Sequence, residues 1–115
     1  MRDNHEESHE RLLHIAKAIT GIEQYVISET EISFCEKDVS NDAVLFQFSI
    51  IGEASIYVET EKLDKYDYLW YQVHSFRNLI AHEHFNVNLQ AVWQIIIKDL
   101  LELKKIINQM LTAEF

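Results

Sequence analysis

The sequence predicts an all-α protein, an antiparallel up-and-down four-helix bundle, with residues 1–115 forming a single domain. The 115 residues include no proline and only two glycines, whereas an average chain of this length has about six prolines and eight glycines. These residues punctuate turns and break helices, so their scarcity favours a few long helices over a sheet. Apolar residues also recur at helical spacing in four segments. Four such helices with short connections pack naturally as a bundle.

The first helix is expected from about residue 5 to residue 28. Its apolar stripe recurs every three or four residues and consists of Leu12, Ile15, Ile19, Ile22 and Val26. Charged residues flank the next short stretch, residues 32–36. That stretch is expected to be strand or coil.

The second helix is expected to begin near Ser40, a good N-cap residue. Its inner stripe consists of Val44, Phe48, Ile51, Ser55 and Val58. Residues 46–57 are rich enough in β-branched and aromatic side chains to suit a strand, but the neighbouring helices need a partner of equal length. Gly52 lies in the middle of this helix, where glycine costs about 1 kcal/mol relative to alanine. A close helix crossing at Gly52 would explain its presence.

The third helix is expected to start at Asp64, as a cap, and to end between residues 82 and 85. Its apolar stripe consists of Leu69, Trp70, Val73, Phe76 and Ile80. Asn88 is a suitable N-cap for a fourth helix of about 22 residues, roughly 33 Å long. Its stripe consists of Leu89, Val92, Ile96, Leu100, Leu103, Ile107 and Met110.

The charge and composition exclude several classes of function. Ten basic residues against 19 acidic ones give a net charge of -9, which argues against a protein that coats DNA or a membrane. Contact with nucleic acid must therefore rest on a small local site. The single cysteine, Cys35, excludes an intrachain disulfide. Apolar runs are too short to cross a bilayer, and the polar N-terminus does not look like a targeting signal, so we expect a cytoplasmic protein.

Two groups of histidines have the residue types of a metal site but not its context. His5 and His9 formally match the H-E-x-x-H zinc motif. They lie at a fraying helix end with no third ligand nearby, so a solvated first turn is the better interpretation. On one helix, His74 and His82 would be about 12 Å apart, too far to share an ion with His84. We therefore expect no metal site.

The segment of residues 77–85 is the stronger candidate for chemistry. On a helix, Asn78 and His82 lie about 40° apart and can point the same way. Arg77 and His82 lie about 140° apart, so they converge only if the last turn loosens or the arginine wraps around. A neutral imidazole can transfer a proton near pH 7, and a guanidinium can hold a phosphate. Spacing alone favours a simpler alternative, cations that suit the end of a helix dipole.

This segment belongs to a longer pattern that resembles the HepT-like branch of the HEPN superfamily over about residues 8–111. The residues that carry the resemblance are Arg77-Asn78-x-x-x-His82-Glu83-x-Phe85, Val87-Asn88-x-x-x-Val92-Trp93, Lys98-Asp99-Leu100-x-x-Leu103 and, upstream, Asp42-Ala43-Val44 and Ile50-Ile51-Gly52-Glu53-Ala54.

The resemblance implies an all-α bundle that forms a homodimer, with the arginine, the following polar residue and the histidine in the cleft between subunits. Proteins of this branch are toxins of toxin–antitoxin pairs and act as metal-independent endoribonucleases, without a cofactor. Their partner is a small nucleotidyltransferase of the MntA type. In studied pairs, this antitoxin attaches AMP to a tyrosine two residues after the histidine.

Carried over residue by residue, Arg77 would bind and stabilise the scissile phosphate of an RNA substrate. His82 would act as general base or acid when a ribose 2′-hydroxyl attacks that phosphate. Asn78 would position the substrate or His82. Glu53 could orient Arg77, while Glu83 and His84 are further candidates for supporting roles.

The sequence departs from the family pattern at the modified tyrosine, whose position is occupied by His84, and Phe85 has no hydroxyl. Three consequences remain open: neutralisation by binding alone, modification at another residue, or a protein that is no longer a toxin. The alternative function is a noncatalytic subunit that binds a nucleotide or a nucleotidyltransferase. Given the acidic charge, RNA would be bound only through the local cleft, and DNA is not expected as a partner.

Overall fold

The computed structural model describes residues 3–115, and within these residues it contains helices but no strand. The helices are α1 (Asn4–Val26), α2 (Glu31–Glu36), α3 (Asp38–Ile56), α4 (Thr60–Leu63), α5 (Trp70–Glu83), a 3₁₀ turn η1 (His84–Asn86), α6 (Leu89–Lys98) and α7 (Leu100–Ala113). The predicted all-α fold class is confirmed.

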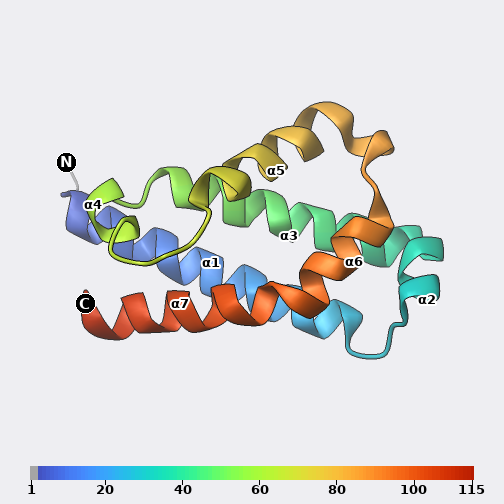
Figure 1. The fold of residues 1–115 in the computed structure, drawn as a ribbon, viewed down its shortest axis with the longest axis horizontal. Coiled ribbons are helices and arrows are strands. Elements are labelled where there is room, and N and C mark those ends of the chain that lie inside the picture. Colours follow the sequence, from blue (N-terminus) through green and yellow to red (C-terminus); the bar gives the residue numbers. More distant parts are fainter. Residues whose placement is uncertain (1–2) are drawn as a thin grey trace.

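Four long runs of helix alternate in direction along a body of 43 × 27 × 24 Å (Figure 1). Helix α1 packs along α3, α3 along α5, and α7 returns along α1. The α6–α7 run forms the fourth member, and the N- and C-terminal ends lie at the same end of the bundle (Figure 1). This is the up-and-down arrangement that the sequence predicts.

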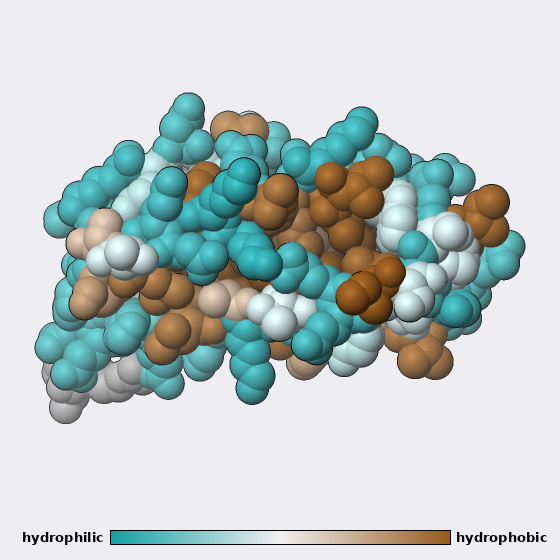
Figure 2. Space-filling model, turned by 90° about the horizontal axis from the view of Figure 1, so that it is seen from below, coloured by the Kyte–Doolittle hydropathy of each residue, from teal (hydrophilic) through white to brown (hydrophobic). Residues whose placement is uncertain are grey.

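The core is built from the predicted stripes. In α1, Leu12, Ile15, Ile19 and Ile22 are fully buried. Every member of the second predicted stripe is also buried, although its last member, Val58, lies just beyond the end of α3. Burying a large aliphatic side chain contributes about 1.5–3 kcal/mol, so these stripes hold the helices together. Apolar side chains also reach the surface in patches between hydrophilic ones, as Figure 2 shows for one face.

The stretch at residues 32–36, expected as strand or coil, is helix α2, so that prediction is wrong. Thr30 and Ser33 form a capping box, in which each side chain bonds to the backbone of the other residue. Helix α3 begins at Asp38, two residues before the predicted cap. The reason is that Asn41 is buried and its side-chain amide donates a hydrogen bond to the carbonyl of Phe34 at 3.2 Å, which ties α2 to α3. The helix continues from residue 46 to Ile56, with Tyr57 as its C-cap, so the strand alternative there is wrong.

The third predicted helix starts at Trp70 rather than Asp64. The buried indole Nε1 of Trp70 donates to the carbonyl of Leu63 at 3.1 Å, and this bond fixes a turn between α4 and α5. As a result Leu69 precedes the helix and is 52% exposed, not part of the apolar stripe.

The fourth predicted helix begins where expected, since the Asn88 side chain accepts a hydrogen bond from the Ala91 N–H at 3.1 Å. It is interrupted at Asp99, however, so α6 and α7 are separate helices. The bend lets α6 pack against α2 while α7 packs against α1. Of the helices described between residues 3 and 115, none has the length and apolar character needed to cross a membrane.

Candidate functional site

Helices α3 and α5 pack in close contact at Gly52. A Cβ atom built on Gly52 would lie 2.3 Å from the Cβ of Arg77 and 3.1 Å from the backbone oxygen of Val73. Any side chain at position 52 would therefore overlap α5. The expected close crossing at this glycine is present, and its neighbour on the other helix is the candidate arginine itself.

The crossing brings Glu53 and Asn78 to the guanidinium of Arg77. The Nη2 atom of Arg77 lies 2.9 Å from Oε2 of Glu53, and Nη1 donates to Oδ1 of Asn78 at 3.0 Å. The side chains of Arg77 and Glu53 are 36% and 41% exposed, so the pair is reached by solvent. The guanidinium is thus held by one hydrogen bond and one ion pair, and several of its five donors remain for a ligand.

His82 lies on the last turn of α5 and is exposed. Its side chain forms no hydrogen bond or ion pair with any of residues 3–115. Helix α5 stays regular from Arg77 to His82, so the last turn does not loosen between them. Within one chain, the two side chains therefore leave the helix about 140° apart.

The remaining candidates lie just beyond α5. Nε2 of His84 is 3.3 Å from Oδ1 of Asp42, at the start of α3. Oε2 of Glu83 accepts a hydrogen bond from the Asn86 side chain at 3.0 Å, which stabilises the 3₁₀ turn. Phe85 is 98% exposed. His84 and Glu83 therefore fix the segment that follows His82, and neither contacts Arg77.

Arg77 and Glu53 line a depression of about 350 Å³ together with two cationic or titratable residues from α1, Arg11 and His14. The Nε of Arg11 donates to Glu7 at 2.8 Å, and its guanidinium lies 4.3 Å from the centre of the Tyr57 ring. Arg11 and His14 are not among the site residues predicted from the sequence. Their spacing of three places them on one helix face, but only the packing of α1 on α3 brings that face to Arg77.

His5 and His9, the two histidines of the H-E-x-x-H match, pack against an aromatic side chain. The rings of His5 and His9 both lie 4.6 Å from the ring of Phe115, measured between centroids. Within residues 3–115, no three histidine, cysteine, aspartate or glutamate side chains are grouped so that they could hold a metal ion.

Apolar side chains are exposed on the same two helices that carry the site. Phe46 on α3 is 63% exposed, and Leu79 on α5 is 44% exposed. With Phe85, they give this part of the molecule large apolar groups in contact with water, a feature that is common at protein–protein interfaces.

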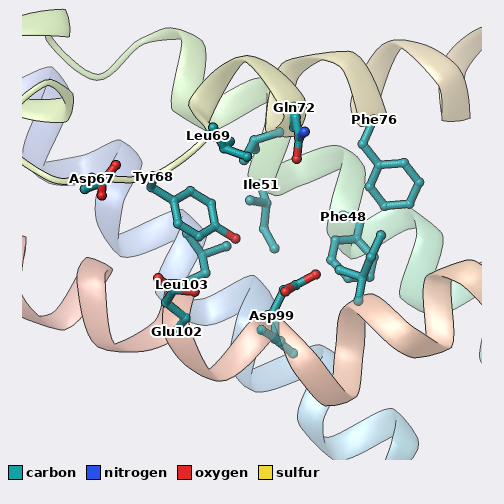
Figure 3. A pocket seen from close by; sticks show the side chains of 13 residues that line it. Phe48, Ile51, Asp67, Tyr68, Leu69, Gln72, Phe76, Asp99, Glu102 and Leu103 are labelled. Carbon is teal, nitrogen blue, oxygen red and sulfur yellow. The ribbon is translucent and has the colours of Figure 1, made fainter.

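A second cavity of about 310 Å³ lies between α3, α5 and the α6–α7 bend (Figure 3). Burial raises the pKa of Tyr68 in its wall to about 12, with further contributions from the carboxylates of Asp99 and Glu102. The phenol therefore stays protonated at neutral pH.

This pKa gives a stability prediction. The unfolded chain loses the Tyr68 proton near pH 10 and the folded chain near pH 12, so the free energy of unfolding should fall as the pH rises between these values. The Tyr68→Phe variant should show a shallower fall, and Tyr25→Phe on α1 is the matched control. Urea unfolding at pH 9, 10 and 11 measures how steeply the free energy of unfolding falls in each variant. Equal slopes in both variants would contradict the assignment to Tyr68.

An all-α bundle with an arginine, an amide and a histidine on one helix, and a glutamate on the helix that crosses it, agrees with the class that the sequence resembles, a HEPN-type domain. Residues 15–110 match the family model described as "Ribonuclease HepT-like". The chain belongs to this family, and the resemblance seen in the sequence is confirmed.

Two relatives agree with this assignment. The protein named "Gamma-glutamylcyclotransferase and putative RNase MJ0434" from Methanocaldococcus jannaschii is 33% identical over 95 residues, which are 82% of this chain and 43% of that protein. The protein named "Putative RNase TTE0752" from Caldanaerobacter subterraneus subsp. tengcongensis is 30% identical over 82 residues, 70% of this chain and 73% of that protein. The chain thus spans less than half of the first relative. No solved structure matches it.

Proposed function

We propose that this protein is a metal-independent endoribonuclease that acts as a homodimer and is the toxin of a toxin–antitoxin pair. The observation that carries the proposal is the guanidinium of Arg77, held 2.9 Å from Glu53 and 3.0 Å from Asn78 on the helix that also presents His82. Family membership supports the same function. The domain would comprise residues 1–115 and work on RNA in the cytoplasm.

In the proposed reaction, the 2′-hydroxyl oxygen of a ribose attacks the adjacent phosphorus. The bond between O2′ and phosphorus forms while the bond between phosphorus and the 5′-oxygen of the next nucleotide breaks. His82 either takes the proton of the 2′-hydroxyl while water protonates the departing 5′-oxygen, or it protonates that oxygen while water takes the proton of the 2′-hydroxyl. Arg77 stabilises the negative charge on the phosphate oxygens, and the products are a 2′,3′-cyclic phosphate and a 5′-hydroxyl.

The geometry of α5 supports the proposed homodimer. Arg77 and His82 leave one helix about 140° apart, a divergence that would suit a phosphate held between two copies. A second copy can supply the histidine opposite this arginine. The exposed side chains of Phe46, Leu79 and Phe85 are apolar groups that such an interface would cover.

For the antitoxin we propose a nucleotidyltransferase of the MntA type that neutralises this protein by binding. The position of the modified tyrosine holds His84, whose imidazole is paired with Asp42 at 3.3 Å. An imidazole paired with a carboxylate differs chemically from the free tyrosine phenol to which AMP is attached in studied pairs. Binding over the exposed end of α5 would block His82 without any covalent step.

The test is incubation of the purified protein with RNA in EDTA, followed by analysis of the ends of the products. We expect cleavage with 2′,3′-cyclic phosphate and 5′-hydroxyl ends, and a dimer by sedimentation. Cleavage that disappears in EDTA, or products with 5′-phosphate ends, would contradict the mechanism. A lack of cleavage combined with stable capture of a nucleotidyltransferase would favour the noncatalytic alternative.

The role of Glu53 gives a separate prediction. Replacing Glu53 with glutamine should lower kcat for RNA cleavage roughly tenfold, because Arg77 loses the charge that fixes its guanidinium. Stability should change by less than about 1 kcal/mol, since the ion pair is reached by solvent. Glu36→Gln, an exposed glutamate on α2, is the matched control. Equal rates in the two variants would show that Glu53 does not position Arg77.

A further inference from the structure

The cavity between α3, α5 and the α6–α7 bend lies apart from the candidate RNA site. It shares no lining residue with the depression beside Arg77. Helix α3 contributes Phe48 and Ile51 to one cavity and Ser49, Ile50 and Glu53 to the other, so the two lie on opposite sides of the α3–α5 pair. A ligand in this cavity would therefore not compete for the Arg77 site.

The wall of the cavity is apolar and aromatic. Phe48 and Ile51 come from α3, Phe76 from α5 and Leu103 from α7 (Figure 3). The rings of Phe48 and Phe76 pack 5.2 Å apart, measured between centroids, and are tilted relative to each other. With a volume of about 310 Å³, the space is at the lower end of the range for small-molecule sites.

Three carboxylates also line this cavity: Asp67, Asp99 and Glu102. None of them forms an ion pair with a cation among residues 3–115, whereas Glu23, Glu53, Glu59 and Glu114 each have one. All three are exposed. Unpaired charges of one sign around a cleft with low-dielectric walls concentrate the electric field there and attract the opposite charge.

The hydroxyl of Tyr68 and the carboxylate of Asp99 point into this space (Figure 3). The phenol can accept or donate a hydrogen bond, and its ring can face a cation. The site therefore combines an apolar wall, aromatic faces and negative charge. An anion such as a nucleotide would be repelled by the same carboxylates.

We propose that this cavity binds a small amphiphilic organic cation, an aromatic or alkyl group that carries one ammonium or guanidinium. The apolar part would contact Phe48, Ile51 and Leu103. The cationic part would lie at the mouth, between Asp99 and Glu102 and near the Tyr68 ring. This site is independent of RNA cleavage, and its test does not require the protein to be active.

The first experiment is titration of the ¹⁵N-labelled protein with tryptamine, followed by amide chemical shifts. A ligand of this size should bind with a Kd of about 1 mM. The shifts should map to α5 and to the region around Asp99. 3-Methylindole, which lacks the charge, should bind several-fold more weakly, and indole-3-propionate should not bind measurably. Raising the salt concentration should weaken tryptamine binding.

Two double variants test which carboxylates recognise the positive charge of the ligand. The double variant Asp99→Asn, Glu102→Gln should bind tryptamine roughly tenfold more weakly, since each exposed ion pair accounts for a factor of about two to five. The Asp99 side chain makes no cap bond to α7, so its replacement removes no hydrogen bond from the start of that helix. The matched control is Glu36→Gln, Asp38→Asn, which removes two exposed charges at the α2–α3 turn. That control should bind as the wild type does.

Three results would overturn the proposal. The first is equal affinity for tryptamine and 3-methylindole, which would leave the carboxylates without a role. The second is an equal loss of binding in the control double variant, which would indicate attraction to the net charge of the whole protein. The third is a set of shifts away from α5 and Asp99, or no shifts at all.

Discussion

Replacing His82 with alanine is expected to lower kcat for RNA cleavage by about 10²- to 10⁴-fold, the usual contribution of a general acid or base. His82 is exposed and makes no hydrogen bond or ion pair within residues 3–115. Its removal should therefore leave the fold and the dimer unchanged. Circular dichroism and sedimentation check the fold and assembly, and initial rates on RNA in EDTA measure the activity.

The matched control is His9→Ala. His9 is also an exposed histidine, but it lies near the start of α1, at the opposite end of the bundle from the end of α5 (Figure 1). This variant should cleave RNA at the wild-type rate. Full activity in the His82 variant would eliminate the imidazole from the mechanism.

The helical stripes could be predicted from sequence because burial on one helix face is a local, periodic property. Leu12, Ile15 and Ile19 are buried as their spacing requires. The ambiguous stretch at residues 46–57 was decided by its neighbours rather than by its own composition. In contrast, the break at Asp99 has no local signal such as proline. The break reflects the packing of α6 on α2 and of α7 on α1, and the spacing of apolar residues does not predict which helix each segment contacts.

In the candidate site too, contacts between residues close in sequence can be predicted, whereas contacts between different helices depend on the packing. Asn78 follows Arg77 directly, so their contact is within reach of a sequence argument. The contact between Glu53 and Arg77, at 2.9 Å, joins two helices, so spacing along one helix does not predict it. The family pattern marks the position of Glu53, and its role in orienting Arg77 is a further inference from that position. Arg11 and His14 were missed because only the packing of α1 on α3 brings them to the same depression.

The second large effect is expected from Gly52→Ala. The new methyl group would lie 2.3 Å from the Cβ of Arg77. Because both atoms are attached directly to helix backbones, relief requires α5 to move away from α3. Overpacking of this kind costs about 1–3 kcal/mol or more, which outweighs the gain of about 1 kcal/mol from replacing a helical glycine. Urea unfolding should show a net loss of stability.

The displacement should also reduce RNA cleavage, since moving α5 carries Arg77 away from Glu53. Gly21→Ala provides the comparison, because both glycines lie inside long helices. A Cβ on Gly21 would meet only the flexible end of the Gln47 side chain, with the nearest atom at 3.4 Å. That variant should be unchanged or more stable by about 0.5–1 kcal/mol, with full activity. If the two alanine variants were equally stable and equally active, α3 and α5 could separate without cost, and the close crossing would not be what positions Arg77.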